Sequence, residues 1–144
     1  MKHVKSIGHV ALRVRDIDRS LDFYVRQLGF AEMFRLEREG QLWIVYLRIT
    51  DTQYLELFPD AIGERAPPSD AVGINHVCLE VDDMDAAIKE ITDSGVKLTQ
   101  QKKTGADHND QAWIEDPDGN RIELMQLSPK AMQLDAIRRL AHAR

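Results

Sequence analysis

The chain has 144 residues, of which 43% are hydrophobic and 30% charged, proportions that are ordinary for a water-soluble globular protein. A formal net charge of -5 gives no electrostatic reason to bind nucleic acid or an anionic membrane, and no apolar run is long enough to span a bilayer. A lone cysteine, Cys78, forms no internal disulfide, and the N-terminus lacks the apolar core of a signal peptide. We therefore expect a soluble, cytoplasmic protein with neither nucleic-acid nor membrane partners.

The first half of the sequence predicts a strand, a helix and three more strands. Residues 7–14 alternate between apolar and other side chains, as a strand requires. Asp16 and Asp18 are typical helix-start carboxylates, apolar residues then recur at helical spacing, and Gly29 ends the helix. Three segments rich in β-formers follow, at residues 30–36, 42–49 and 53–58.

The second half predicts the same order after a linker. Residues 59–73, with three prolines and two glycines, break every periodicity and form that linker. We then expect a strand at 74–81, a helix at 84–94 ended by Gly95, a strand around 96–100, a polar loop at 101–110, and strands at 111–115 and 121–127. The tail, residues 129–144, has apolar residues at helical spacing and predicts an amphipathic helix that packs on the domain or on a partner subunit.

The second half is a copy of the first at a constant offset of 67 positions, from His9 to His76. Residues 7–21 read IGHVALRVRDIDRSL and residues 74–88 read INHVCLEVDDMDAAI. The same offset places YLELF, residues 54–58, on RIELM, residues 121–125. A repeated unit of this kind predicts one module that needs a copy of itself to complete a core. The fold class is therefore α+β, with tandem βαβββ modules at residues 7–58 and 74–127 inside a single domain of residues 1–128.

Each module carries a histidine in its first strand and a glutamate 47 positions later, and these four residues are the candidate site. Strand alternation places His9, Glu56, His76 and Glu123 out of phase with their apolar neighbours, hence on the sheet face that the helices leave free. Two carboxylates lining one cavity repel each other unless a cation neutralises them. The sequence therefore predicts one divalent ion on the four side chains, and nitrogen and oxygen ligands of this kind suit Ni, Co, Zn, Fe or Mn.

At this point the motifs GHVALRV, NHVCLEV, YLELF and EDPDGNRIELMQ resemble those of the vicinal oxygen chelate superfamily, from residue 7 to residue 127. That superfamily includes glyoxalase I, methylmalonyl-CoA epimerase, extradiol dioxygenases, fosfomycin-modifying transferases and metal-free drug-binding proteins. The resemblance implies a cupped mixed sheet around a divalent metal. The dioxygenases and fosfomycin enzymes typically use two His and one Glu, and the epimerase tends to carry Gln where Glu56 stands. The full set of two His and two Glu is most similar to bacterial glyoxalase I.

The resemblance implies a lyase that isomerises a 2-oxoaldehyde hemithioacetal to a 2-hydroxyacyl thioester, with methylglyoxal and glutathione as the leading substrates. The ion would stabilise an enediolate while a glutamate, Glu123 before Glu56, moves the proton. Arg13 falls where the family holds a glutathione carboxylate, and Lys103 and His108 are further candidates for substrate binding. The loop at 101–110 departs from the family's glycine-rich loop, so an epimerase or isomerase on another α-oxygenated substrate remains an alternative, as does a small-molecule-binding resistance protein. A homodimer is expected, because half-size modules and the C-terminal helix offer apolar faces.

Overall fold

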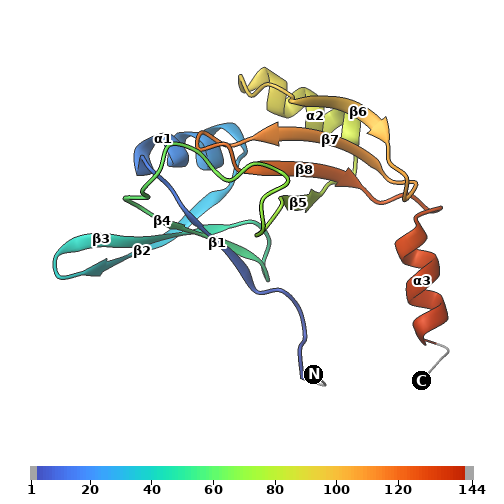
Figure 1. The fold of residues 1–144 in the computed structure, drawn as a ribbon, viewed down its shortest axis with the longest axis horizontal. Helices are drawn as coiled ribbons and strands as arrows, with labels where there is room; N and C mark the ends of the chain where they lie inside the picture. Colours follow the sequence, from blue (N-terminus) through green and yellow to red (C-terminus); the bar gives the residue numbers. More distant parts are fainter. Residues whose placement is uncertain (1–2, 142–144) are drawn as a thin grey trace. The chain divides into compact units, whose positions relative to one another are not determined.

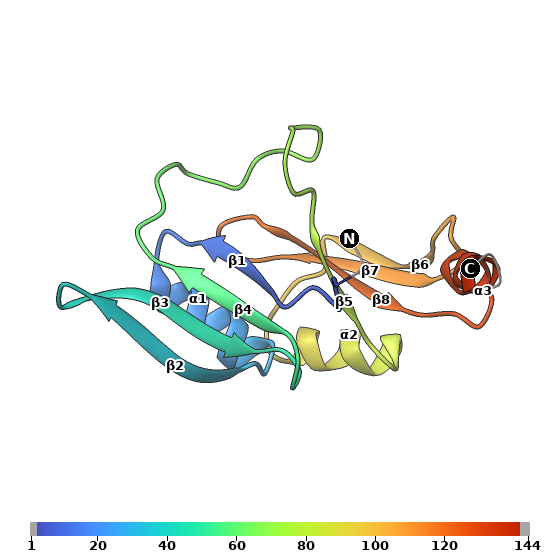
Figure 2. The same cartoon turned by 90° about the horizontal axis from the view of Figure 1, so that it is seen from below.

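The structure is a computed structural model that describes residues 3–141 of the chain. The chain divides into two compact units between Ala66 and Pro67, inside the segment that the sequence marks as a linker. Each unit contains one four-stranded mixed sheet (Figures 1 and 2). The predicted α+β class and the tandem modules are therefore confirmed.

The first unit has the strand order β1-β4-β3-β2. Strand β1 pairs in parallel with β4, and the other two pairings are antiparallel. Asp16 caps the helical segment, because its side chain accepts a hydrogen bond from the Arg19 backbone N–H at 3.0 Å. The elements are β1 (His9–Arg13), α1 (Ile17–Leu21), a π-helical continuation (Asp22–Gln27), β2 (Ala31–Arg38), β3 (Gln41–Arg48) and β4 (Tyr54–Phe58).

The core of the first unit lies on one face of this sheet. Leu47 and Leu57 are completely buried, and Phe23 and Tyr24 of the helical segment are almost so. These strand residues alternate with Tyr46 and Glu56, which face the other side. The sheet therefore has one face covered by helix and one face that carries the polar residues.

The second unit repeats this arrangement with the strand order β5-β8-β7-β6. Strand β5 pairs in parallel with β8, and α2 packs on β7 and β8. Asp83 caps α2 by accepting from the backbone N–H groups of Asp85 and Ala86, both at 3.0 Å. The elements are β5 (Val77–Glu80), α2 (Met84–Asp93), β6 (Gln100–Thr104), β7 (Asp110–Glu115), β8 (Arg121–Gln126) and α3 (Met132–Ala141).

One strand of the second unit lies later in the chain than predicted. The sequence favours a strand around residues 96–100 and a loop over 101–110, whereas the structure places β6 at Gln100–Thr104. Every residue of β6 is exposed, because it is the edge strand of its sheet. A polar, lysine-rich edge strand protects the sheet from pairing with other chains but shows no apolar alternation. The prediction was wrong because it relied on that alternation.

The C-terminal helix α3 is anchored at its N-terminal end by a buried asparagine. The side chain of Asn109 is fully buried and donates to Asp107 Oδ2 at 2.8 Å and Gln133 Oε1 at 3.1 Å. Its Oδ1 accepts from the Ser128 backbone N–H at 2.9 Å. No residue of α3 is buried, and the helix stands clear of the sheet beyond β8 (Figure 1). The predicted tail helix is thus observed, and its last three residues, 142–144, lie outside the described part. No helix within residues 3–141 is long and apolar enough to cross a membrane.

Candidate metal centre

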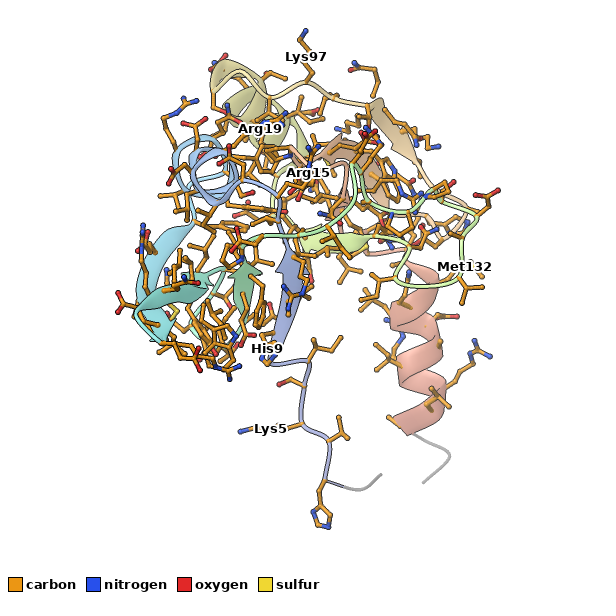
Figure 3. The ribbon with its side chains drawn as sticks, turned by 60° about the vertical axis from the view of Figure 1, so that its left-hand side comes forward. Lys5, His9, Arg15, Arg19, Lys97 and Met132 are labelled. Atoms are coloured by element: carbon orange, nitrogen blue, oxygen red, sulfur yellow. The ribbon has the colours of Figure 1, made fainter. Side chains whose placement is uncertain are left out.

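The first module brings its predicted histidine and glutamate together on the polar face of the sheet. His9 begins β1 (Figure 3), and its Nε2 lies 3.6 Å from Glu56 Oε1 on the neighbouring strand β4. The Glu56 side chain is only 9% exposed, whereas His9 is about half exposed. A nearly buried carboxylate therefore faces an accessible imidazole.

The second module forms the equivalent pair, with His76 Nε2 at 3.0 Å from Glu123 Oε2. Asn75 orients this histidine: its Nδ2 donates to the Ser69 carbonyl at 2.7 Å, so its Oδ1, 2.8 Å from His76 Nδ1, accepts from that ring nitrogen. The ring of Trp113 packs edge-on against His76, with 4.8 Å between centroids. This arrangement leaves Nε2 as the nitrogen that faces Glu123 and that is available to a ligand.

The separation within each pair suits two donors on one metal ion. Two ligand atoms that each lie about 2.1 Å from an ion stand about 3.0 Å apart at roughly 90° and about 3.4 Å apart at a tetrahedral angle. The observed separations, 3.0 and 3.6 Å, are close to these two values. Within residues 3–141, neither unit alone gathers three His, Cys, Asp or Glu side chains that could hold an ion. Each module therefore brings together one histidine and one glutamate at a spacing that two ligands of one ion could have.

The two carboxylates differ in what lies beside them. In the first module, Tyr46 is directly opposite Glu56 across β3 and β4, and a hydrogen bond to the Glu56 carboxylate raises the pKa of the Tyr46 phenol. In the second module, Cys78 is directly opposite Glu123 across β5 and β8. Cys78 is exposed as a residue, but partial loss of solvent around its sulfur, followed by the negative charge of Glu123, raises the pKa of its thiol to about 12. This thiol is therefore protonated at neutral pH.

The predicted substrate-binding residues are placed at three different positions. Arg13 lies on the His9 face of β1, with its guanidinium 5.6 Å from the centre of the Phe58 ring. Lys103 lies on β6 opposite Gln111, which shares the face of Glu123, and its Nζ donates to Gln100 Oε1 at 3.2 Å. His108 lines a separate pocket of about 480 Å³ in the second unit, together with Thr104, Asp110, Gln126 and residues 127–130. Neither His76 nor Glu123 lines that pocket.

Three residues next to the site are absent from the sequence-based set, namely Tyr46, Asn75 and Trp113. The repeat contains the signal for two of them, because Tyr46 and Trp113 occupy equivalent positions at the offset of 67 and both stand opposite the module's glutamate. Asn75 precedes His76 directly, where the first module has Gly8. Its role depends on the distant carbonyl of Ser69, which no local pattern predicts.

The fold and the repeated His–Glu pairs define a class of proteins built from paired βαβββ modules. The Glyoxalase/Bleomycin resistance protein/Dioxygenase superfamily matches residues 6–124. Lactoylglutathione lyase of Pseudomonas aeruginosa is 30% identical, over 84% of this chain and 82% of its own length. Human mitochondrial methylmalonyl-CoA epimerase is 28% identical, over 69% of this chain and 60% of its own length. The crystal structure of SMU.1112c superposes with a TM-score of 0.75 at 30% identity, covering 85% of this chain and 98% of that protein.

The chain therefore belongs to the glyoxalase/bleomycin resistance/dioxygenase superfamily, which is the vicinal oxygen chelate superfamily that the sequence motifs indicate.

Proposed function

We propose that this protein is a metal-dependent lyase of the glyoxalase I type. The observation that carries the proposal is the presence, in each module, of a His–Glu pair at equivalent positions of the repeat with ligand-like spacing. A relative named lactoylglutathione lyase at 30% identity supports the same activity. The substrate is then the hemithioacetal of a 2-oxoaldehyde such as methylglyoxal with glutathione, and the product is a 2-hydroxyacyl thioester.

The four side chains His9, Glu56, His76 and Glu123 are the proposed ligands. Two neutral imidazoles and two carboxylates balance the charge of a divalent ion, and Ni, Co, Zn, Fe and Mn all accept nitrogen and oxygen donors. When bound, such an ion supplies Lewis acidity that stabilises negative charge on neighbouring substrate oxygens. The two His–Glu pairs that bind one ion belong either to a single chain or to two copies of the chain, since each module supplies two of the four proposed ligands.

Proton transfer is assigned to a glutamate of this set. In the proposed reaction, the Glu123 carboxylate removes the proton from the carbon that bears the substrate hydroxyl and returns it to the adjacent carbon, while the hydroxyl proton passes to the oxygen of that adjacent carbon. Glu56 is the second candidate for this role and otherwise serves as a ligand. His9 and His76 keep their positions during the proposed reaction. Asn75 orients the ring of His76.

Substrate recognition is assigned to the cationic residues on the polar faces of the two sheets. In this proposal Arg13 binds a glutathione carboxylate, because a guanidinium can form two parallel hydrogen bonds with a carboxylate. The guanidinium also packs over the ring of Phe58. Lys103 contributes a second positive charge on the Glu123 face. His108 binds substrate only by way of the separate pocket at Thr104 and Asp110, which makes it the weakest member of the predicted set.

A metal-dependent epimerase or isomerase is the second candidate, favoured by the human epimerase among the relatives. Such an enzyme needs the same carboxylate to exchange a proton on an α-oxygenated carbon, but it needs no thiol. A metal-chelating resistance protein that binds a small molecule without turning it over is the non-catalytic alternative.

One assay separates the three. Metal-reconstituted protein is given methylglyoxal with and without glutathione, and thioester formation is followed by its ultraviolet absorbance. Turnover only with glutathione supports the lyase. If proton exchange on α-oxygenated acids or thioesters occurs without any thioester formation, the lyase proposal is wrong and the epimerase takes its place. Binding of the small molecule without either reaction supports the resistance-protein alternative.

We also propose a cytoplasmic homodimer. The helix α3 exposes more than half of the surface of Met132, Ile137 and Leu140 and buries no residue, although its sequence is amphipathic. An uncovered apolar face of this kind favours a second copy of the chain as its partner.

A further inference from the structure

Each glutamate of the candidate centre has one neighbour directly opposite on each adjacent strand, and these neighbours differ between the modules. Glu56 lies between Ala11 of β1 and Tyr46 of β3. Glu123 lies between Cys78 of β5 and Trp113 of β7, which are the equivalent positions of the repeat. Directly opposite side chains on one face have Cβ atoms about 5 Å apart, so they interact. The repeat thus places a phenol beside one carboxylate and an indole beside the other.

Tyr46 lies directly opposite Glu56 on the neighbouring strand, and its phenol hydrogen-bonds to the Glu56 carboxylate. Its ring stacks on Phe34 with 4.4 Å between centroids and 25° between planes, which fixes the ring on the polar face of the sheet. Ala11, on the other side of Glu56, has no polar group that could compete for the carboxylate. Glu56 is itself among the buried residues of the first unit. A buried carboxylate that accepts a phenol hydrogen bond is confined to one position.

The neighbours of Glu123 restrain it less. Neither Cys78 nor Trp113 carries a hydroxyl, and the Cys78 thiol, which hydrogen-bonds to Glu123, is only a weak donor. The indole N–H of Trp113 is already used, because it donates to Gln111 Oε1 at 3.1 Å. The Glu123 side chain is also somewhat more exposed than that of Glu56, at 14% against 9%.

We propose that Tyr46 is a positioning residue that fixes Glu56 as a permanent ligand, while Trp113 at the equivalent place leaves Glu123 free to move. This inference rests on the proposed function, since it concerns the same four ligands. It explains how two chemically identical carboxylates in a near-symmetric repeat take different roles. A carboxylate that transfers a proton would need freedom to move, and Glu123 has no neighbouring hydroxyl that would hold it in place.

The test uses Tyr46→Phe, which keeps the ring and its contact with Phe34 and removes only the hydroxyl. The matched control is Tyr54→Phe, on the same strand as Glu56, whose hydroxyl donates to the Asp51 carbonyl at 3.5 Å. Dissociation constants for Co²⁺ and Zn²⁺ are measured on the full-length proteins by competition with a chromogenic chelator. Losing a second-layer hydrogen bond to a ligand costs roughly 10–100-fold in metal affinity. We expect a loss in that range for Tyr46→Phe and a change below about threefold for Tyr54→Phe.

A reciprocal variant tests the other half of the proposal. Trp113→Tyr provides Glu123 with a phenol, and proton exchange per bound metal is expected to fall about tenfold or more. Equal metal affinity in Tyr46→Phe and Tyr54→Phe would overturn the role of Tyr46, and full normalised exchange in metal-loaded Trp113→Tyr would overturn that of Trp113. Failure of the proposed function is visible separately in the unmodified protein, as an absence of divalent metal binding or of proton exchange. The affinity comparison between the tyrosine variants still judges Tyr46 if metal binds without turnover.

Discussion

The low reactivity of the Cys78 thiol follows from partial burial of its sulfur and, second, from its position beside Glu123. The pKa of this thiol is raised from 9.0 to about 12, so at pH 8 the folded protein holds about 10³-fold less thiolate than the denatured chain. A more basic thiolate is also a better nucleophile. With a Brønsted slope of about 0.4–0.5, the rate per thiolate is roughly 15–30-fold higher in the folded protein. The depletion of thiolate is the larger of the two effects, so the folded protein should react on the order of ten- to a hundredfold more slowly than the denatured chain.

The assay is the reaction of metal-free protein with a chromogenic aromatic disulfide, with the guanidinium-denatured chain as the reference. Metal must be removed first, because an ion on Glu123 neutralises its charge. The rate should rise tenfold for each pH unit between 7 and 10 without a plateau. Glu123→Gln removes the second cause of the raised pKa and should accelerate the reaction several-fold. A folded-state rate within threefold of the denatured rate, or a plateau below pH 10, would refute this reasoning.

Three other predictions follow from the described contacts. Asn109→Ala should lower the free energy of unfolding by about 2–3 kcal/mol in urea titrations, because it leaves the Ser128 N–H without its acceptor. Replacing the exposed Gln133 by Ala should cost less than about 1 kcal/mol, and equal losses in the two variants would contradict the anchoring role of Asn109. Glu123→Gln should reduce the rate of proton exchange per bound metal by a factor of roughly 10²–10⁴, because Gln retains an oxygen ligand but cannot carry the proton. Glu56→Gln should reduce this rate by less, and a larger reduction in Glu56→Gln would mean that Glu56 is the base and Glu123 the ligand. Light scattering at micromolar concentrations should give the mass of a dimer, and a monomer mass throughout would disprove the predicted homodimer.

Most of the fold is encoded in local patterns that can be interpreted without coordinates. Alternation of apolar residues, the helix-start carboxylate Asp16 and the glycines Gly29 and Gly95 predicted the strands and helices of both modules, except for β6, and the offset of 67 predicted their equivalence. The same alternation predicted that the histidine and glutamate of each module share a face, where the structure brings them within 3.6 and 3.0 Å. Periodicity succeeds here because each sheet has one covered face.

Features that depend on tertiary context were not predictable in this way. Strand β6 has no apolar alternation because both of its faces are exposed, so its position was misplaced by several residues. The helix after Asp16 becomes a π-helix at Asp22–Gln27, a change of hydrogen bonding that helical spacing does not distinguish from an α-helix. The roles of Tyr46 and Asn75 depend on partners ten and six residues away, which meet only through strand pairing or a loop carbonyl.

Metal binding by both histidines tests the central claim most directly. Metal-free protein is reconstituted with Ni²⁺, Co²⁺ or Zn²⁺, freed of excess ion, and measured for metal per chain, alongside His9→Ala, His76→Ala and the double variant. We predict one equivalent per chain in the unmodified protein, a marked loss of affinity in each single variant, and no tight binding in the double variant. Less than about half an equivalent in the unmodified protein, or undiminished binding when both histidines are replaced, would contradict the account.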